Sequence, residues 1–293
     1  MRHAWLWAAS AILAGPAALA QAPASGTALR IIAFGAHPDD CDQKAGGTAA
    51  KWAAMGHQVK FVAVTNGDAG HQTEGGGALA RRRRAEAPEA ARRFGIVEYD
   101  TLDNHDGQLV PSVDVREQVI RKIRQWRADI VLAPRPNDYH PDHRYTGVLI
   151  QDAAYMVVVP NIAPDTPPLR KNPVFLYFQD GFERPNPFRP DVAVAIDDVL
   201  DKKIHALDAH TSQMYEWLPW VAGNLEEVPK DPAARIEWLR KTRSGRPLSD
   251  ALRDAVRKRY GAKADAVRNV EAFELCEYGR RPSEDELSRL FPF

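Results

Sequence analysis

Apolar residues are concentrated in short runs along the first two thirds of the chain. The runs at residues 29–34, 59–65 and 129–133 lack the polar alternation of a strand that is exposed on one face, so we predict buried strands there. Shorter apolar runs predict further strands. The predicted strands are residues 29–34, 59–65, 98–102, 129–133, 174–178 and 192–196.

Amphipathic segments with helical periodicity lie between these runs. Gly56 and Gly95 follow two of the segments, as glycines do at helix ends. Because strands alternate with helices, we predict an α/β fold with a Rossmann-like, mostly parallel sheet and helices on both faces. Ligands bind such sheets beyond the carboxyl ends of the strands. The predicted helices are residues 43–55, 78–94, 112–126, 144–158 and 202–216.

The N-terminus has the layout of a secretory signal peptide. Residues 1–20 contain one arginine, a long apolar run and the small residues that a signal peptidase reads at Ala18-Leu19-Ala20. A membrane anchor is the alternative, but the run is short of the roughly 20 residues of a span and contains Pro16. We expect cleavage after Ala20 and an exported, periplasmic or secreted protein whose mature form has no membrane span.

The rest of the chain divides into two parts. We assign residues 21–218 to the α/β domain and residues 219–293 to a largely helical C-terminal extension packed on the same domain. Trp217 and Trp220 lie at this boundary. Aromatic faces suit sugars, but core packing or a subunit contact is the alternative that we favour for these two residues.

The composition is that of an ordinary globular protein. Hydrophobic residues make up 44% of the chain and charged residues 27%. Lys and Arg together number 39, as do Asp and Glu, so the chain lacks the broad positive charge of a nucleic-acid-binding protein. We therefore expect no nucleic-acid partner.

Cys41 and Cys276 are the only cysteines of the chain. An oxidising compartment would permit them to pair, but two cysteines do not form a disulfide framework. Because Cys41 lies within the polar motif that follows the first strand, we favour two free, buried thiols.

That motif, GAHPDDCD at residues 35–42, places several polar groups at the end of a buried strand. Pro38 fixes its own φ and keeps His37 extended, so the turn that follows can bring His37 and Asp40 to one point. Asp39 then faces elsewhere. Two adjacent carboxylates in one site repel each other, and a cation between them is one remedy.

A second polar segment, RPNDYHPDHRYTG, follows the strand at residues 129–133. It offers His140, Asp142 and His143 at the same edge of a parallel sheet. His, Asp and His are zinc ligand types, and a catalytic zinc site uses three protein ligands. The remaining carboxylate and histidine are what a metallohydrolase needs to activate water and to assist the leaving group.

The segments AHPDD and, far downstream, HPDH resemble the PIG-L or LmbE-like de-N-acetylase family. The supporting segments VAVTNGDAG, RRAE at residues 83–86 and LDNHDGQL lie in the order that the family shows. The similarity spans roughly residues 30–210, and the late segment KIHALDAHTSQMYEW also resembles the family.

The resemblance implies that His37, Asp40 and His143 bind zinc. It also implies that Asp39 is the general base that acts on water.

Further roles follow from the same resemblance. His140 would stabilise the tetrahedral intermediate or protonate the departing amine, and Asp142 would orient an imidazole. Arg83 would contact the substrate, while Glu86 would support the loop or helix.

The chain departs from the family pattern at two places. Asp42 replaces a glutamate that is usual two positions after the second aspartate, which puts a contact from that position in doubt. Asp138 stands where some members carry a tyrosine, with Tyr139 next to it.

Two glycines after the first motif, Gly46 and Gly47, lack the spacing of a phosphate-binding loop, so we attribute them to close packing of the helix.

We therefore predict an exported, zinc-dependent hydrolase that removes an N-acetyl or other N-acyl group from a small molecule or glycan bearing an N-acetylated amino sugar. The alternatives are another zinc-dependent amidase or esterase, and an inactive exported binding protein with the same fold. Asp39 discriminates between them, because a binding protein needs the metal ligands but not the additional carboxylate.

Overall fold

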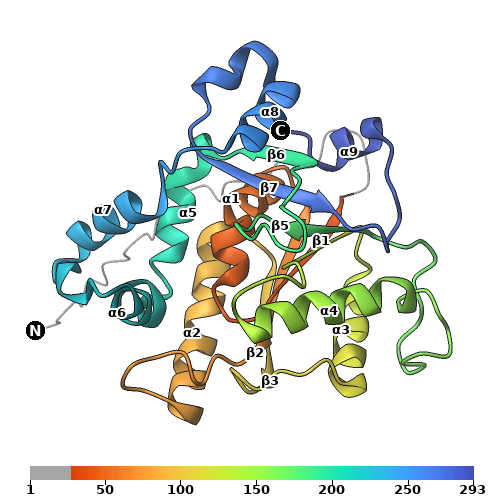
Figure 1. Ribbon diagram of the computed structural model, residues 1–293. Helices are drawn as coiled ribbons and strands as arrows, with labels where there is room; N and C mark the ends of the chain where they lie inside the picture. The colour runs from red at the N-terminus through yellow and green to blue at the C-terminus, as the bar shows by residue number, and fades with distance from the viewer. Residues whose placement is uncertain (1–27) are drawn as a thin grey trace, which may run out of the picture.

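The computed structural model describes residues 28–293 and contains a single mixed β-sheet within that part of the chain (Figure 1). Its strands are β1 (Arg30–Gly35), β2 (Gln58–Thr65), β3 (Glu98–Asn104), β4 (Ile130–Ala133), β5 (Val174–Phe178), β6 (Val192–Ala195) and β7 (Val270–Leu275). Their order is β3-β2-β1-β4-β5-β7-β6. All neighbours from β3 to β5 are parallel, whereas β7 is antiparallel to β5 and β6. The predicted mostly parallel sheet is confirmed.

Helices cover both faces of this sheet. They are α1 (Asp40–Ala54), α2 (Gly76–Phe94), α3 (Val113–Trp126), α4 (Pro141–Met156), α5 (Leu200–Leu207), α6 (Leu218–Ala222), α7 (Pro232–Arg243), α8 (Asp250–Tyr260) and α9 (Glu284–Leu290). α1, α2 and α5 lie on one side of the sheet and α3 and α4 on the other (Figure 1).

Local signals fix several helix ends. The Ser112 side chain accepts a hydrogen bond from the Val115 backbone N–H at the start of α3. Gly95 ends α2 in the left-handed region, with φ 78°, and its N–H donates to carbonyl groups of the last turn. These are the boundaries that the sequence pattern predicts.

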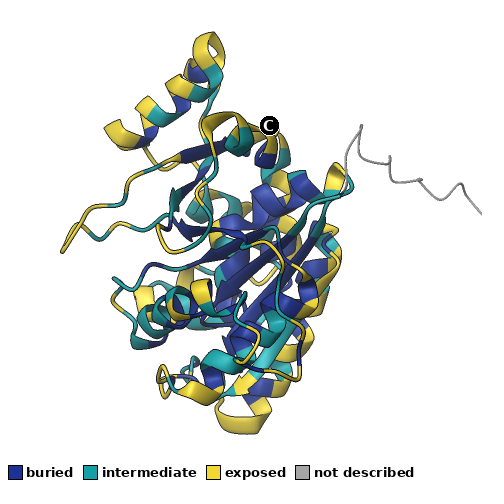
Figure 2. Ribbon diagram, turned by 90° about the vertical axis from the view of Figure 1, so that its right-hand side faces the viewer, coloured by how far each residue is buried: buried dark blue, intermediate teal, exposed yellow. Residues whose placement is uncertain are grey.

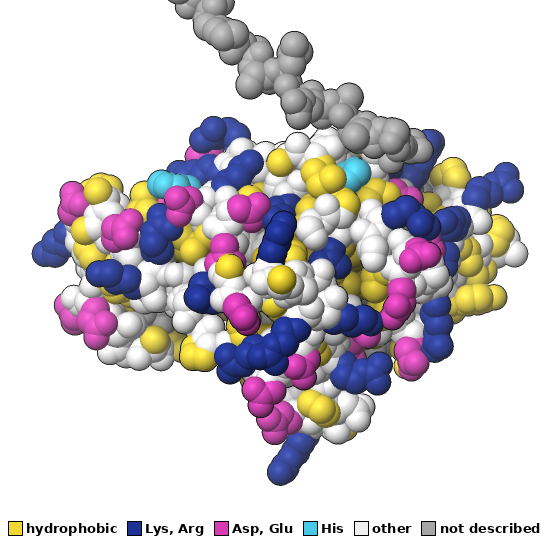
Figure 3. All heavy atoms as spheres, turned by 90° about the horizontal axis from the view of Figure 1, so that it is seen from above, with side chains coloured by type: hydrophobic (Ala, Val, Ile, Leu, Met, Phe, Trp, Pro, Cys, Tyr) yellow, Lys and Arg dark blue, Asp and Glu magenta, His cyan; other side chains and the backbone are white. Residues whose placement is uncertain are grey.

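Most strand residues are buried, whereas the outer surfaces of the helices are exposed. Figure 2 shows the strands buried at the centre and exposed residues on the outer sides of the helices. Positive and negative side chains are interspersed on the face seen from above (Figure 3), in keeping with the equal numbers of the two signs.

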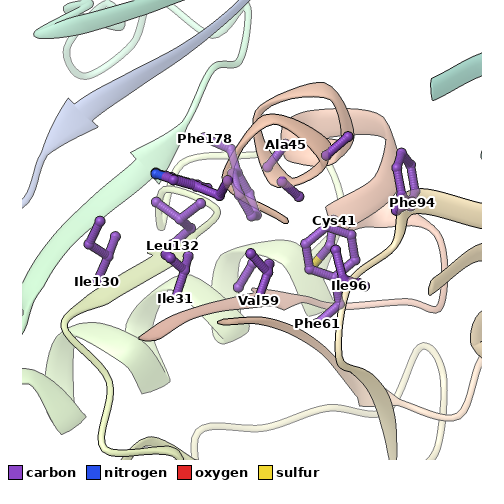
Figure 4. Packing of buried hydrophobic residues seen from close by; sticks show 14 of the residues in the cluster. Ile31, Cys41, Ala45, Val59, Phe61, Phe94, Ile96, Ile130, Leu132 and Phe178 are labelled. Atoms are coloured by element: carbon purple, nitrogen blue, oxygen red, sulfur yellow. The ribbon is translucent and has the colours of Figure 1, made fainter. Parts of the chain in front are cut away.

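The sheet divides the apolar core into two layers. Along β1, Ile31 and Ala33 belong to the layer beneath α1 and α2, whereas Ile32 and Phe34 belong to the layer beneath α3 and α4. Side chains alternate between the faces of a strand, so a strand that is apolar throughout is covered on both. Figure 4 shows the first layer, where side chains of β1, β2 and β4 meet those of α1 and α2.

The two cysteines lie in different layers. Cys41 is packed beneath α1 and Cys276 on the α3 and α4 side, and both are free and buried. Because the sheet lies between them, the prediction of two free thiols is confirmed.

Gly46 and Gly47 allow α1 to approach its neighbours closely. A Cβ on Gly46 would lie 2.5 Å from the Phe94 ring of α2, and one on Gly47 would lie 2.8 Å from Ile196 at the end of β6. These distances are shorter than real Cβ contacts, so the packing role predicted for the two glycines is confirmed.

The predicted helix at residues 202–216 is interrupted. α5 ends at Leu207, and a π-helical segment, η2 (Gln213–Trp217), precedes α6. The reason is tertiary: His210 is fully buried against Asp42, and Ser212 donates to the carboxylate of Glu86. These contacts outweigh the helical pattern of the segment.

The C-terminal quarter contributes more to the sheet than its sequence suggests. Strand β7, which the sequence pattern missed, lies between β5 and β6. α8 packs its apolar side on β6. The domain boundary at residue 219 stays a prediction.

The signal peptide expected at residues 1–20 lies outside the described residues. Within residues 28–293, no helix combines the length and the apolar character that a membrane crossing requires.

The loops after β1 and β4 form the natural ligand crevice of this sheet. β1 and β4 are neighbours in the sheet. The chain continues from β1 to β2 on one side and from β4 to β5 on the other, so the loops that follow β1 and β4 run in opposite directions. GAHPDDCD follows β1, and RPNDYHPDH follows β4.

Candidate active site and metal centre

The turn after β1 is held by its own backbone. The N–H groups of Asp39 and Asp40 both donate to the His37 carbonyl, at 3.0 and 3.2 Å, and α1 begins at Asp40. Asp39 has φ 154° and ψ −15°, a conformation that non-glycine residues rarely adopt. Strained backbone of this kind concentrates at functional sites.

Three side chains from the two motifs converge on one point. The distance from His37 Nδ1 to Asp40 Oδ2 is 3.5 Å, from His143 Nε2 to Asp40 Oδ2 3.4 Å, and from His143 Nε2 to His37 Nδ1 3.2 Å. Zinc bonds of about 2.0–2.2 Å at tetrahedral angles place ligand atoms about 3.3–3.6 Å apart. The three predicted ligands therefore fit a metal ion of this size.

The outer nitrogens of both imidazoles face carboxylates. His37 Nε2 lies 3.0 Å from Asp106 Oδ1 and 3.3 Å from Asp142 Oδ2, and His143 Nδ1 lies 2.9 Å from Asp138 Oδ1. A carboxylate that accepts a hydrogen bond from the far side of a histidine is the usual support for a metal ligand. Asp142 lies where the resemblance implies that it orients an imidazole.

Other groupings of ligand-type atoms occur around His37. His37, His140 and His143 form one such group, and His37, Asp106, His140 and Asp142 form another. The second group is disfavoured because Asp142 is fully buried and already accepts from the backbone N–H groups of Gly107 and Leu109. The ligand role of His37, Asp40 and His143 stays a prediction, which the distances between their side chains support.

The electrostatics of the cluster favour a cation. Burial alone would raise the pKa of Asp40, but His143 and His37 hold it well below its usual value. Burial alone would lower the pKa of His143, but Asp40 and Asp138 raise it to about 9. The carboxylates thus stabilise positive charge at the point where the two rings meet.

Asp39 is buried beside this cluster and does not belong to the ligand set. Its Oδ1 accepts from Arg83 Nη2 and its Oδ2 from Gln43 Nε2, each at 2.9 Å. Burial raises the pKa of Asp39, and the Arg83 charge opposes that rise. Two donors thus fix the carboxylate that the resemblance assigns as general base.

Arg83 reaches Asp39 from α2 and is only 2% exposed. Its guanidinium also donates to the Pro38 carbonyl at 3.1 Å. Gly67 and Gly70 make room for it, since a Cβ at these positions would lie 2.5 and 3.2 Å from Arg83 Nη1. The contact that the structure shows is with Asp39; the substrate contact of Arg83 stays a prediction.

Glu86, one turn further along α2, supports a different segment. Its carboxylate accepts from the Thr211 hydroxyl, the Ser212 backbone N–H and the Ser212 hydroxyl. The supporting role implied for Glu86 agrees with these contacts.

Asp42 is fully buried and forms a polar contact between three elements. It accepts from the Tyr99 hydroxyl of β3 at 2.9 Å, and its other oxygen lies 3.0 Å from His210 Nε2. Burial opposes charge on His210, but Asp42 raises the pKa of this imidazole above its usual value. The shorter side chain at this position is thus used as a structural partner.

His140 is half-buried at the start of α4. Its Nδ1 lies 3.2 Å from the backbone N–H of Asp142 and must accept from it, so in a neutral ring the proton is on Nε2. Burial lowers the pKa of His140, and the nearby His37 and His143 lower it further. The site therefore favours a neutral imidazole that donates from Nε2.

A cavity of about 580 Å³ opens over these groups. Trp217 belongs to its wall and stacks on Trp220, with 5.3 Å between ring centroids and 15° between planes. Trp220 is 51% exposed, which places it outside the core. The cavity wall includes His37, Asp39, Asp40, Gln43, Arg83, Asp106, Asp138, Tyr139, His140, His143, Gln213 and Trp217.

Three contributing residues received no role from the sequence. Asp106 lies within the LDNHDGQL segment and Asp138 two residues before His140, so proximity to the motifs was the available signal. Gln43 is the third residue of an ordinary helical turn after Asp40, and nothing local distinguishes it.

Comparisons with known proteins show which family the chain resembles. The family model described as PIG-L, GlcNAc-PI de-N-acetylase, matches residues 32–154. The chain is 32% identical to diacetylchitobiose deacetylase of Thermococcus kodakarensis over 204 residues, which cover 65% of this chain and 73% of that protein.

Two further proteins extend the comparison. The probable N-acetyl-alpha-D-glucosaminyl L-malate deacetylase 2 of Bacillus cereus is 29% identical over 215 residues, covering 69% of this chain and 90% of its own length. The solved structure of N,N′-diacetylchitobiose deacetylase from Pyrococcus horikoshii has a TM-score of 0.63 at 26% identity, covering 85% of this chain and 84% of that one.

Proposed function

Because the chain belongs to the PIG-L family of de-N-acetylases, a family of metal-dependent hydrolases of amide bonds, we propose that it removes an N-acetyl group from an amino-sugar-containing substrate. The observation that carries the proposal is the triangle of His37, Asp40 and His143 with Asp39 buried beside it. The relatives named for chitobiose and glucosaminyl malate support the choice of substrate class.

We propose zinc as the metal, since two imidazoles and one carboxylate are zinc ligand types at zinc spacing. Bound zinc would polarise the amide carbonyl as a Lewis acid and would lower the pKa of its water to about 7. Asp106 and Asp142 hold the His37 imidazole, and Asp138 holds that of His143.

Asp39 carries the proton transfers, and His140 stabilises the tetrahedral intermediate. Asp39, held by Arg83 and Gln43, accepts the proton of the attacking water. His140, neutral and donating from Nε2, would hydrogen-bond the oxygen that gains charge in the tetrahedral intermediate. The proton held by Asp39 is then available to the departing amine, and the products are a free amine and acetate.

We also propose that the protein is exported. The signal-peptide pattern of residues 1–20 is the support for this. Export is tested by N-terminal sequencing of the protein recovered outside the cytoplasm, where a mature N-terminus at Gln21 is expected. Recovery of the uncleaved chain from the cytoplasm alone would contradict it.

Substitution of the base tests the catalytic proposal. Asp39→Asn keeps the side-chain shape but cannot accept the proton, so kcat for amine release from N,N′-diacetylchitobiose should fall by roughly 10²–10⁴-fold. Metal content, measured by elemental analysis, should stay at the wild-type level because Asp39 is not a ligand.

The matched control is Asp103→Asn, which changes an exposed carboxylate of β3 outside the site. It should keep wild-type turnover. Equal turnover by Asp39→Asn and wild type would exclude the base assignment. Bound metal without amine release from any of a panel of N-acetylated sugars would favour a different amide or ester substrate.

A further inference from the structure

A second cavity of about 410 Å³ adjoins the catalytic one. The two share Gln43, Lys44, Asp180 and Gly181 in their walls, so these residues separate one cavity from the other. Most of the remaining wall of the second cavity comes from α5, from residues 243–248 at the end of α7 and after it, and from residues 268–271 at the start of β7. Figure 1 shows α5 between α7 and the sheet in this region.

The wall of this second cavity carries unneutralised positive charge. It is lined by Lys44, Arg243, Arg246 and Arg268. Among the described residues, no carboxylate oxygen lies within the ion-pair distance of 4.0 Å from the side-chain nitrogens of these four. Its two carboxylates are already paired: Asp180 with Arg135 at 2.6 Å, and Glu271 with Lys203 at 2.7 Å. The cavity therefore has an excess of cations.

Arg243 links this charge to the catalytic machinery. Its Nη1 lies 3.4 Å from Gln43 Oε1, and the Gln43 amide donates to Asp39 on its other side. Its Nε is buried and has no hydrogen-bond partner among the described residues. Burial lowers the pKa of Arg243, the Asp39 charge opposes that shift, and the Arg246 charge adds to it. A buried donor without a partner costs stability unless a ligand satisfies it.

The positive charge is local. The chain has no net charge, and both signs are interspersed on the face shown in Figure 3. A nucleic acid or an anionic membrane would need an extended basic surface, whereas a walled cavity of this volume suits a single small group.

We propose that the second cavity binds an oxyanion, a carboxylate or a phosphate, carried by the part of the substrate that lies away from the scissile acetamide. The substrate is then an acidic amino-sugar conjugate. This inference rests on the proposed de-N-acetylase activity. It assigns a specificity role to residues 243–248 and 268–271, which lie outside the region matched by the family model.

Three probes that share the same non-reducing N-acetylated sugar test the inference: N,N′-diacetylchitobiose, its reducing-end aldonate and its 1-phosphate. Calorimetric titration of the metal-loaded protein should give a Kd about tenfold lower for at least one anionic probe than for the neutral sugar. The anionic probe with the larger gain in affinity shows whether the cavity binds a carboxylate or a phosphate. Amine release from each probe is measured in parallel, and KM should follow the same order.

Arg246→Ala is the informative variant, because Arg246 is exposed and lines the second cavity but not the catalytic one. It should remove most of the preference for the anionic probe and leave kcat/KM for the neutral sugar unchanged. Lys258→Ala removes one charge from α8 outside both cavities and is the matched control, which should retain the preference.

Binding and turnover separate the two proposals. Equal affinity for all three probes, or an equal loss in both variants, would overturn the anion site even if amine is released. An anion preference that depends on Arg246 without amine release from any probe would support the site and count against the proposed activity.

Discussion

His37 uses both of its ring nitrogens, and this division explains why so many carboxylates surround it. Nδ1 faces Asp40 and His143, where a metal fits, while Nε2 faces Asp106 and Asp142. A hydrogen bond at Nε2 fixes the tautomer in which Nδ1 has its lone pair free for a metal. The acidic residues near the motif are thus supports for ligands rather than further ligands.

Asp138 is the supporting residue whose role is most directly testable. Asp138→Ala removes the acceptor at His143 Nδ1, so we expect the metal affinity to fall about 10–100-fold, as measured by competition with a chelating dye. With saturating metal, part of the activity should return.

Asp103→Ala is the control for this substitution. It removes an exposed carboxylate near the end of β3, which pairs with Arg84 and does not contact His143. Its metal affinity should match wild type. An unchanged affinity in Asp138→Ala would show that His143 needs no support from this carboxylate.

At the scale of elements, α1 connects the catalytic turn to three parts of the fold. Its first residue is Asp40, its middle residues Gly46 and Gly47 lie against α2 and Ile196, and the backbone N–H groups of Gly47 and Thr48 donate to Glu271 of β7. The position of Asp40, a proposed metal ligand, is therefore set by the packing of the whole helix.

Gly46→Ala tests that packing. The new Cβ would lie 2.5 Å from the Phe94 ring, so we expect a loss of about 1–3 kcal/mol in the free energy of unfolding, measured by urea denaturation. Gly77→Ala at the exposed start of α2 is the control.

The control substitution meets only Arg81 Nη1, at 3.4 Å, and should be neutral or stabilise by up to about 1 kcal/mol, because alanine is the better helix former. Similar effects of the two substitutions would contradict the packing argument for Gly46.

For the whole molecule, the C-terminal quarter is joined to the α/β sheet by β7. The edge strand β6 has β7 as its strand partner, and β5 has β7 on one side. Residues from the same quarter also line the cationic cavity. The extension therefore contributes a strand to the sheet and residues to the proposed specificity site.

Truncation after residue 218, the predicted domain boundary, tests this dependence. Without β7, β6 loses its ladder and β5 becomes an exposed apolar edge, so we expect an insoluble or aggregating chain. Gel filtration and circular dichroism measure the outcome. A chain starting at residue 28 and ending at residue 293 is the control and should fold, and a folded monomer of the truncated chain would show that residues 21–218 are sufficient.

Much of the fold and the ligand set follows from local sequence. The apolar runs place β1 to β6 within a few residues of their observed bounds, because a short continuous apolar run and the glycines that end helices are local signals. The two motifs follow buried strands of a parallel sheet, which predicted that they meet at one edge, and the resemblance to the family implied His37, Asp40 and His143 as the ligands.

Tertiary contacts decided the rest. They break the predicted helix at residues 208–210, place β7 in the sheet, and give Asp42, Asp106, Asp138 and Gln43 their partners. Each of these features depends on atoms that are distant in sequence or on the orientation of one side chain. Periodicity and motif spacing carry no information about such contacts. The sequence alone therefore determined where the strands end and which residues are the candidate metal ligands, while the packed structure decided what holds them in place.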